Sequence, residues 1–302
     1  MKRTLNVAII VVMIFIAIPS LAQEHEEIVY GHKDGMALVM EKVKPAKPNG
    51  KAILFLMSGG YFSSNNWLAN GLASSKQFLD HGYTVFLVFH GSKPKYNVLQ
   101  VTGDITRAIK FVRYNAKKFG IDPDHIGMHG NSSGGHLTLY AATADDTSVK
   151  DSKDPVERVS SKLQAACVFY PPTDFLNFGE PGASIVINKN LAAERDVAAS
   201  FDFRIWNDSL QAYDIPDANK QTEIVKHLSP LYNVSKDDAP VYIVHGDKDW
   251  VVPLQQSQVL VAAYKSAGVP YELVVKPGAE HGWKDENLDR EKMVQWFDKY
   301  LK

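Results

Sequence analysis

Short, uninterrupted apolar runs that each end in a turn signal are the feature that most constrains the fold of this 302-residue chain. The clearest is Ala52-Ile53-Leu54-Phe55-Leu56, which leads into Ser58-Gly59-Gly60. Runs of this length without polar alternation are typical of strands buried on both faces of a parallel sheet. Further strands are expected at 28–32, 36–43, 84–89, 125–129, 164–170, 240–245 and 271–275, and helices at 68–82, 98–119, 136–144 and 287–300. Because strands alternate with helices, we predict an α/β fold with a mostly parallel central sheet and helices on both faces.

One stretch departs from this alternation. Between Asp174 and about His227 the chain has no clear strand pattern, but it holds the aromatic residues Phe175, Phe178, Phe201, Phe203, Trp206 and Tyr213. We predict an inserted helical cap near 174–227 that lies over the carboxyl ends of the strands, where open parallel sheets bind their ligands. The alternative is that these aromatic residues only pack a surface excursion.

Residues 1–22 have the pattern of a secretory signal peptide. A positively charged start precedes the apolar stretch Leu5–Ile18, and the small residues Ser20 and Ala22 mark a cleavage site after Ala22. A membrane anchor is the alternative, but the stretch is shorter than the about 20 residues that a spanning helix needs. We therefore expect residues 23–302 to form one secreted or periplasmic domain without stable membrane insertion of the mature chain.

The composition is that of an ordinary globular protein, with 45% hydrophobic and 22% charged residues. The formal net charge is −1 and no run of like charge stands out, so nucleic acid is not an expected partner. The one cysteine, Cys167, lies in an apolar run, where we expect a buried thiol and not a nucleophile. The histidines are scattered along the chain, so we expect no metal site and no cofactor.

The segment Gly130-Asn131-Ser132-Ser133-Gly134 matches G-x-S-x-G, in which a serine sits on a sharp strand-to-helix turn. The expected strand 125–129 and helix 136–144 flank it. Glycines two residues before and after Ser132 let the neighbouring backbone pass without a Cβ clash. A glycine-rich loop that merely joins the two elements is the alternative. We predict that Ser132 is a nucleophile.

A serine hydroxyl needs a base that takes its proton. His281 follows the expected strand 271–275, and its neutral ring can accept this proton and later return it to the leaving group. A carboxylate must orient that ring and stabilise its charged form. Asp249, in the loop after the strand 240–245, gives the chain order Ser, Asp, His. Asp247, in the same loop, is the rival candidate for this role.

A nucleophilic serine also needs hydrogen-bond donors for the oxyanion of the tetrahedral intermediate. We expect these donors to be the backbone N–H groups of Gly59, Gly60 and Ser133. The alternative for the two glycines is a flexible turn without this role. Candidate substrate-binding residues are Tyr61, which follows the glycines, and Phe203 and Trp206 in the predicted cap.

Taken together, these motifs resemble the esterase/lipase branch of the α/β-hydrolases, the group related to hormone-sensitive lipase and to bacterial feruloyl and acetyl esterases. The resemblance runs from about Tyr30 to the end of the chain and is weakest in the cap. The matching segments are Gly130-Asn131-Ser132-Ser133-Gly134-Gly135-His136, Tyr170-Pro171-Pro172-Thr173-Asp174, Ser229-Pro230, and His245-Gly246 through Asp249 to Val252-Pro253. The family's His-Gly-Gly-Gly motif is replaced by Met57-Ser58-Gly59-Gly60, which keeps the two glycines credited with the oxyanion hole.

This resemblance implies the α/β-hydrolase fold and a serine carboxylesterase, with Ser132, Asp249 and His281 as a catalytic triad and without a cofactor. The expected substrate is a short-acyl or carbohydrate-linked ester, either a small molecule or attached to a polysaccharide, cleaved through an acyl-enzyme. One alternative is a peptidase resembling the prolyl oligopeptidase catalytic domain, although such proteins usually carry a large N-terminal propeller. A catalytically inactive binding protein on the same fold is the other alternative, which the complete triad disfavours.

Overall fold

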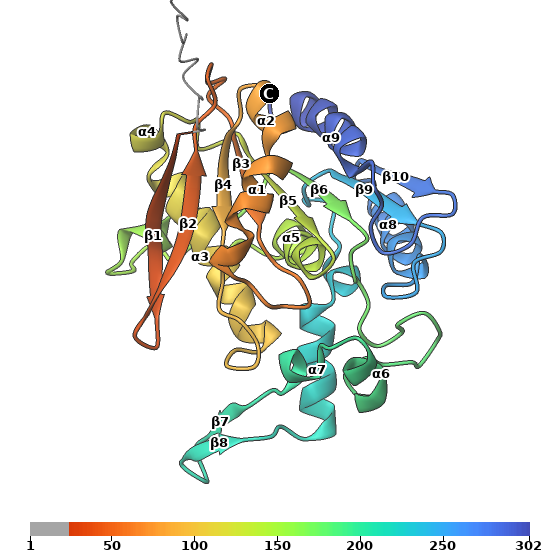
Figure 1. Cartoon of the computed structure of the whole chain (residues 1–302). Coiled ribbons are helices and arrows are strands. Elements are labelled where there is room, and N and C mark those ends of the chain that lie inside the picture. Colours follow the sequence, from red (N-terminus) through yellow and green to blue (C-terminus); the bar gives the residue numbers. More distant parts are fainter. Residues whose placement is uncertain (1–23) are drawn as a thin grey trace, which may run out of the picture.

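The computed structural model describes residues 24–302, so the predicted signal peptide lies outside the described residues. A sheet of eight strands forms its centre, in the order β1-β2-β4-β3-β5-β6-β9-β10 (Figure 1). The strands are β1 (His25–Lys33), β2 (Met36–Val43), β3 (Ala52–Leu56), β4 (Thr84–Val88), β5 (Ile126–Asn131), β6 (Ala165–Phe169), β9 (Val241–Gly246) and β10 (Tyr271–Lys276). Strand β2 pairs antiparallel with β1 and β4, and the pairs from β4 to β10 are all parallel. The predicted mostly parallel sheet is confirmed.

Helices cover both faces of this sheet, because side chains of a buried strand alternate between two apolar cores. In β3, Leu54 and Leu56 face one core and Ile53 and Phe55 face the other. The first core packs against α3 (Val98–Tyr114), α5 (Ser133–Thr143) and α8 (Gln255–Ala267). The second packs against α1 (Leu68–Ser74), α2 (Lys76–Asp80) and α9 (Glu286–Tyr300). The cover of helices on both faces of the sheet follows from the uninterrupted apolar runs that form the strands.

Two predicted helices are interrupted in the structure. The segment 68–82 is divided into α1 and α2, preceded by a 3-10 turn, η1 (Asn65–Trp67). The segment 98–119 is divided at Asn115 into α3 and α4 (Ala116–Phe119). Gly120 ends α4 with a φ of 70°, a left-handed conformation that glycine adopts readily. No helix in the described part of the chain is long and apolar enough to cross a membrane.

The segment between β6 and β9 contains the region in which the sequence predicts a helical cap. It holds two helices, α6 (Lys189–Glu194) and α7 (Ala218–Leu228), and the 3-10 turns η3 (Ala198–Phe201) and η4 (Pro230–Asn233). It also holds a two-stranded hairpin, β7 (Ile205–Asn207) and β8 (Ala212–Asp214), which extends away from the central sheet in Figure 1. The hairpin is absent from the prediction because strands of three residues carry no recognisable alternation.

Candidate active site

Ser132 sits between the end of β5 and the start of α5, on a backbone with φ 53° and ψ −120°. This conformation is unfavourable for a residue with a side chain and is held by its neighbours. The Ser132 N–H donates to the Phe169 carbonyl over 3.0 Å, and the Ser132 carbonyl accepts from the His136 N–H over 2.9 Å. A Cβ at Gly130 would lie 2.3 Å from the Gly134 carbonyl oxygen. The turn thus requires glycine at position 130 and exposes the Ser132 hydroxyl at its tip.

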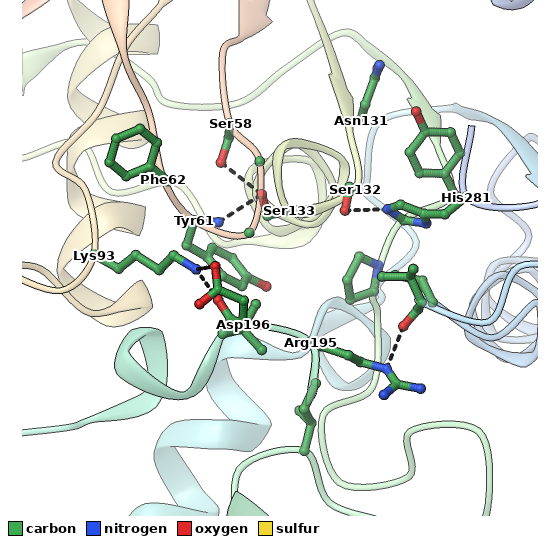
Figure 2. Close-up of a pocket in the computed structure, with 18 of the residues that line it drawn as sticks. Ser58, Tyr61, Phe62, Lys93, Asn131, Ser132, Ser133, Arg195, Asp196 and His281 are labelled. Carbon is green, nitrogen blue, oxygen red and sulfur yellow. Dashed lines mark hydrogen bonds and ion pairs between the residues drawn. The ribbon is translucent and has the colours of Figure 1, made fainter. Parts of the chain in front are cut away.

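Three side chains from three loops form a continuous hydrogen-bond chain. The Ser132 Oγ lies 2.9 Å from the His281 Nε2, and the His281 Nδ1 lies 2.7 Å from the Asp249 Oδ2. In Figure 2, the Ser132 and His281 side chains point toward each other. With Nδ1–H donating to the carboxylate, Nε2 is free to accept the serine proton. The structure therefore brings together the three residues that the sequence proposes for a triad.

The Asp249 carboxylate has no solvent exposure and accepts several hydrogen bonds. Its Oδ1 accepts from the backbone N–H groups of Val251 and Val252, each over 2.9 Å. Burial raises the pKa of Asp249, but hydrogen bonds from His245 and His281 outweigh it and hold the pKa below its ordinary value. The acid is thereby ionised and fixed behind the imidazole.

His245 is a second histidine that contacts this acid, at the same carboxylate oxygen as His281. Its Nε2 lies 2.9 Å from the Val252 carbonyl oxygen and 3.4 Å from the Asp249 Oδ2. Its Nδ1 lies 2.7 Å from the Ser257 Oγ. Because a carbonyl only accepts, Nε2 carries the hydrogen and Nδ1 accepts from Ser257. From the sequence, His245 is interpreted as a structural residue that ends a strand within a segment matching the family. Its four-residue spacing from Asp249 is the signal for this contact.

Asp247, the rival acid, points elsewhere. Its Oδ1 accepts a hydrogen bond from the Gly278 N–H over 2.7 Å, and the residue is exposed. It thus supports the turn that precedes the His281 loop. Of the two aspartates that the sequence leaves open, only Asp249 contacts the His281 ring.

The turn after β3 supplies one side of the expected oxyanion hole. Gly59 and Phe62 exchange two backbone hydrogen bonds of 2.9 Å, and Gly60 and Tyr61 between them have φ values of 53° and 62°. The Gly59 N–H is therefore already bonded to the Phe62 carbonyl. Within residues 24–302, neither the Gly60 N–H nor the Ser133 N–H donates a hydrogen bond. Of the three predicted donors, only Gly60 and Ser133 are unoccupied, because the tight turn uses the amide of Gly59.

Beside Ser132 lies a pocket of about 680 Å³. Its apolar wall comes mainly from the segment between β6 and β9, with Phe175, Phe178, Ile185, Val197 and Phe201. Polar and aromatic side chains complete the lining, among them Tyr61, Phe62, Trp67, Lys93, Arg195 and Asp196. The Lys93 ammonium bonds the Asp196 carboxylate over 2.8 Å and ties this segment to the loop after β4 (Figure 2). The inserted segment thus forms one wall of the pocket.

Two of the three predicted substrate-binding residues do not line this pocket. Tyr61 does, whereas Phe203 is buried behind Phe201, with ring centroids 6.2 Å apart. Trp206 lies on β7, 49% exposed, and its ring packs on Tyr213 of β8. The sequence reveals that the segment is aromatic but not which aromatic ring points inward.

Tyr170 is a pocket residue that sequence reasoning missed. It has a φ of 37°, its ring centroid lies 4.4 Å from that of His281, and its hydroxyl donates to the Glu286 Oε1 over 2.8 Å. Burial raises the pKa of Tyr170 well above its ordinary value, with the Glu286 carboxylate adding to the rise. The phenol therefore stays neutral and supports one face of the imidazole. No group of three or more side chains placed to hold a metal ion occurs in the described residues.

The BD-FAE family model matches residues 40–264, which include Ser132 and Asp249. The chain belongs to the BD-FAE family. Among curated relatives, the esterase LipQ of Mycobacterium tuberculosis is 26% identical over 80% of this chain and 52% of its own length. An acetylxylan esterase of Xylanibacter ruminicola is 22% identical over 90% of this chain and 49% of its own. This BD-FAE family member thus spans about half the length of these relatives.

A solved structure of a truncated carbohydrate esterase from gut microbiota superposes on this BD-FAE family member with a TM-score of 0.70. The two are 25% identical, and the match covers 92% of this chain and 96% of the other. Together with the strand order, this similarity confirms the predicted α/β-hydrolase fold and the esterase branch.

Proposed function

We propose that this chain is a serine carboxylesterase that cleaves short-acyl or carbohydrate-linked esters through an acyl-enzyme. The observation that carries the proposal is the hydrogen-bond chain from Ser132 through His281 to Asp249, placed beside two unoccupied backbone amides. Nucleophile, base, acid and oxyanion donors are the parts that acyl transfer requires.

In the first half-reaction, the Ser132 Oγ attacks the ester carbonyl carbon while its proton moves to the His281 Nε2. The carbonyl oxygen becomes an oxyanion, and the Gly60 and Ser133 N–H groups stabilise it. The Asp249 carboxylate stabilises the imidazolium. The C–O bond to the alcohol then breaks as His281 returns the proton to the leaving oxygen, and an acyl-enzyme remains.

In the second half-reaction, His281 takes a proton from a water molecule, whose oxygen attacks the acyl carbon through the same oxyanion site. The bond to the Ser132 Oγ breaks, Oγ recovers the proton, and the carboxylic acid leaves. Tyr170, packed on the imidazole, keeps the ring in place between the two proton transfers.

The substrate class rests on the pocket and on the names of the relatives. The apolar wall of Phe175, Phe178 and Ile185 fits an acyl chain. Phe62, 42% exposed, packs edge-on against Trp67 at the same pocket, and aromatic rings of this kind can stack on the apolar face of a sugar. An acetylxylan esterase and a carbohydrate esterase are among the similar proteins. Since residues 1–22 have the pattern of an export signal, we propose an extracellular or periplasmic ester.

The decisive experiment is the Ser132→Ala variant, assayed with p-nitrophenyl esters and acetylated xylan. We expect a loss of turnover of about 10⁴–10⁶-fold with an unchanged melting temperature, because nucleophile and base act as a unit. Ser209→Ala, an exposed serine in the β7–β8 turn, is the matched control. A fluorophosphonate probe should label the parent and the control but not Ser132→Ala. Turnover within tenfold of the parent in Ser132→Ala would refute the proposal.

A further inference from the structure

The turn that carries the Gly60 amide is strained at Tyr61. A φ of 62° is common for glycine but unfavourable for a residue with a Cβ, and Tyr61 follows Gly60 in the same left-handed region. Two successive residues of this kind between Gly59 and Phe62 direct the Gly60 N–H away from the hydrogen bonds of the turn itself. Such a conformation persists only where the surroundings hold it.

The hydroxyl group of Ser133, the residue after Ser132, holds this turn. The Tyr61 N–H donates to the Ser133 Oγ over 3.1 Å, and the Ser133 Oγ lies 3.0 Å from the Ser58 Oγ. Figure 2 shows Ser133 bonded to both partners. Because the Ser133 oxygen accepts from Tyr61, its own hydrogen can be donated to Ser58. Ser133 is 2% exposed, so solvent competes little for these bonds.

Other contacts hold Tyr61 from the remaining sides. Its carbonyl accepts from the Lys93 N–H over 3.2 Å. Its ring is buried and packs edge-on against His136 and Phe201. These contacts fix the side chain and the carbonyl, but the peptide group that joins Gly60 to Tyr61 is held through the bond to Ser133.

We propose that the Ser133 hydroxyl is a positioning group that aligns the two oxyanion donors with each other. The Ser133 N–H is one donor, and the Ser133 Oγ holds the peptide next to the other donor, the Gly60 N–H. One donor lies at the start of α5 and the other in the turn after β3, and the Ser133 side chain joins the two through the Tyr61 N–H. The inference rests on the proposed function, since it assigns a role within the same oxyanion hole.

The test is Ser133→Ala, which keeps the backbone N–H and removes only the hydroxyl. We expect kcat to fall about 10–100-fold, less than the 10²–10³-fold typical of losing a donor outright, with KM within about twofold. A trifluoromethyl ketone, which forms a tetrahedral adduct with the serine and places an oxyanion in the hole, should lose affinity by a similar factor. The matching methyl ketone, which binds without forming the adduct, should bind as before.

Two further variants separate positioning from general loosening of the loop. Ser58→Ala should lower kcat by a smaller factor, and the double variant should be no slower than Ser133→Ala alone, because Ser58 acts through Ser133. Ser63→Ala removes two other bonds of the same loop, in which the Ser63 Oγ donates to the Met57 carbonyl and accepts from the His90 N–H. It should lower the melting temperature without changing kcat.

Unchanged kcat in Ser133→Ala would overturn the inference, and so would an equal loss of affinity for the two ketones. Failure of the proposed function is recognised separately. In that case Ser132→Ala stays active, whereas an inactive Ser132→Ala beside a fully active Ser133→Ala overturns only the positioning role.

Discussion

Asp249 and Asp247 occupy the same loop but contact different partners. Asp249→Asn should lower kcat by about 10⁴-fold, because an amide in that place no longer stabilises the imidazolium or selects its tautomer. Asp247→Asn should keep kcat within about threefold and lower stability by about 0.5–1.5 kcal/mol, since the Asp247 side chain bonds the Gly278 N–H and not the His281 ring. Turnover and urea unfolding of both variants check the assignment. An inactive, stably folded Asp247→Asn would reverse it.

Three buried histidines outside the triad give folding a dependence on pH. Burial lowers the pKa of His129 to about 3, and that of His90 and of His136 to about 4. An unfolded histidine takes up a proton near pH 6.5, whereas these residues in the folded protein do so only in stronger acid. Their contribution to the free energy of unfolding is thus complete above about pH 6.5 and is lost progressively as the pH falls toward 3–4.

His129→Asn should weaken this dependence. An asparagine amide can replace the bond from the His129 Nδ1 to the Cys167 carbonyl without adding a titrating group. Each buried histidine should remove about 2 kcal/mol between pH 6.5 and pH 5, at about 1.4 kcal/mol per pH unit. Urea unfolding at pH 7 and pH 5 should therefore show about 2 kcal/mol less loss in the variant. An equal loss in both proteins would contradict the role of His129.

At the scale of elements, the segment between β6 and β9 forms the apolar wall of the pocket, to which we assign the acyl chain. Phe178→Ala should shift preference toward longer acyl chains, because loss of the Phe178 ring from the apolar wall enlarges the pocket beside Ser132. Trp206→Ala is the matched aromatic control and should leave the preference unchanged, since Trp206 lies on the exposed hairpin. Rates on p-nitrophenyl esters from acetate to octanoate measure the shift. Equal profiles for both variants would remove Phe178 from the acyl site.

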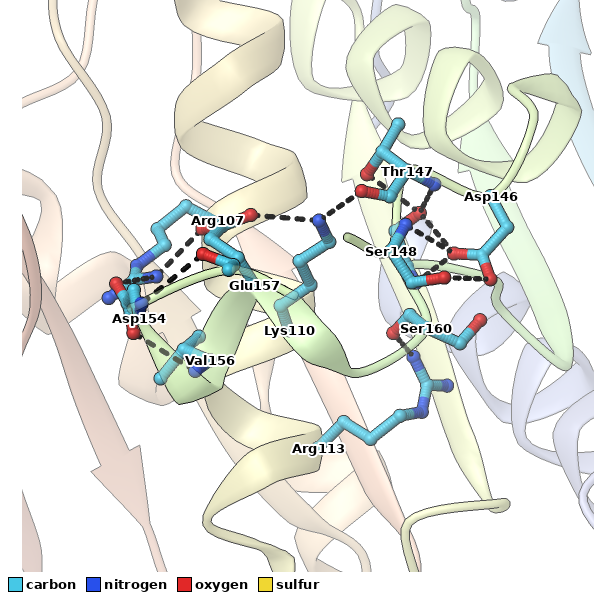
Figure 3. A network of polar contacts seen from close by, with 12 residues as sticks. Arg107, Lys110, Arg113, Asp146, Thr147, Ser148, Asp154, Val156, Glu157 and Ser160 are labelled. Atoms are coloured by element: carbon cyan, nitrogen blue, oxygen red, sulfur yellow. Dashed lines mark hydrogen bonds and ion pairs between the residues drawn. The ribbon is translucent and has the colours of Figure 1, made fainter. Parts of the chain in front are cut away.

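A polar network joins α3 to the segment that leads from α5 to β6 (Figure 3). The Lys110 side chain is 1% exposed, and its Nζ donates to the Glu157 Oε2 over 2.8 Å and to the Thr147 carbonyl over 2.7 Å. Lys110→Ala should lower the free energy of unfolding by about 2–4 kcal/mol. This loss is smaller than that expected for a fully buried ion pair, because Glu157 is partly exposed. Turnover per folded molecule should not change, and Lys117→Ala, an exposed lysine of α4, should alter neither quantity. A loss below about 0.5 kcal/mol in Lys110→Ala would contradict this role.

The elements differ in how far the sequence predicts them. Strands such as β3 and β9 are predictable because their residues are apolar on both faces. The hydrogen-bonded group of Ser132, His281 and Asp249 is predictable from motifs whose spacing and chain order follow from the fold. The sequence does not predict that the Gly59 amide is already hydrogen-bonded. The motif identifies the glycine, but the type of turn determines which backbone amides stay unbonded. The inward direction of Phe178, against the outward direction of Trp206, depends on loop paths that leave no periodic pattern.

In the molecule as a whole, Ser132, Asp249 and His281 belong to the well-packed body formed by the central sheet and its helices, whereas one wall of the pocket has a less regular structure. These three residues lie in the turns and loops that follow β5, β9 and β10, and helices cover both faces of the sheet. The wall opposite them is built largely from loops, 3-10 turns and short helices, joined to the body by contacts such as Lys93 with Asp196. We therefore expect that substitutions in this wall can change substrate preference without displacing Ser132, Asp249 and His281.

Every residue of α5, the helix that begins at Ser133, is buried. We expect its hydrogen-bonded amides to reach solvent mainly when the molecule unfolds globally, and those of the exposed β7–β8 hairpin to do so through local opening. In deuterated water, the α5 peptides should thus exchange at the rate set by global stability and the hairpin peptides far sooner. Slower exchange in α5 after an inhibitor binds must then reflect a more stable molecule. Exchange in α5 can therefore serve as an internal reference for global stability, against which exchange rates in other segments are compared.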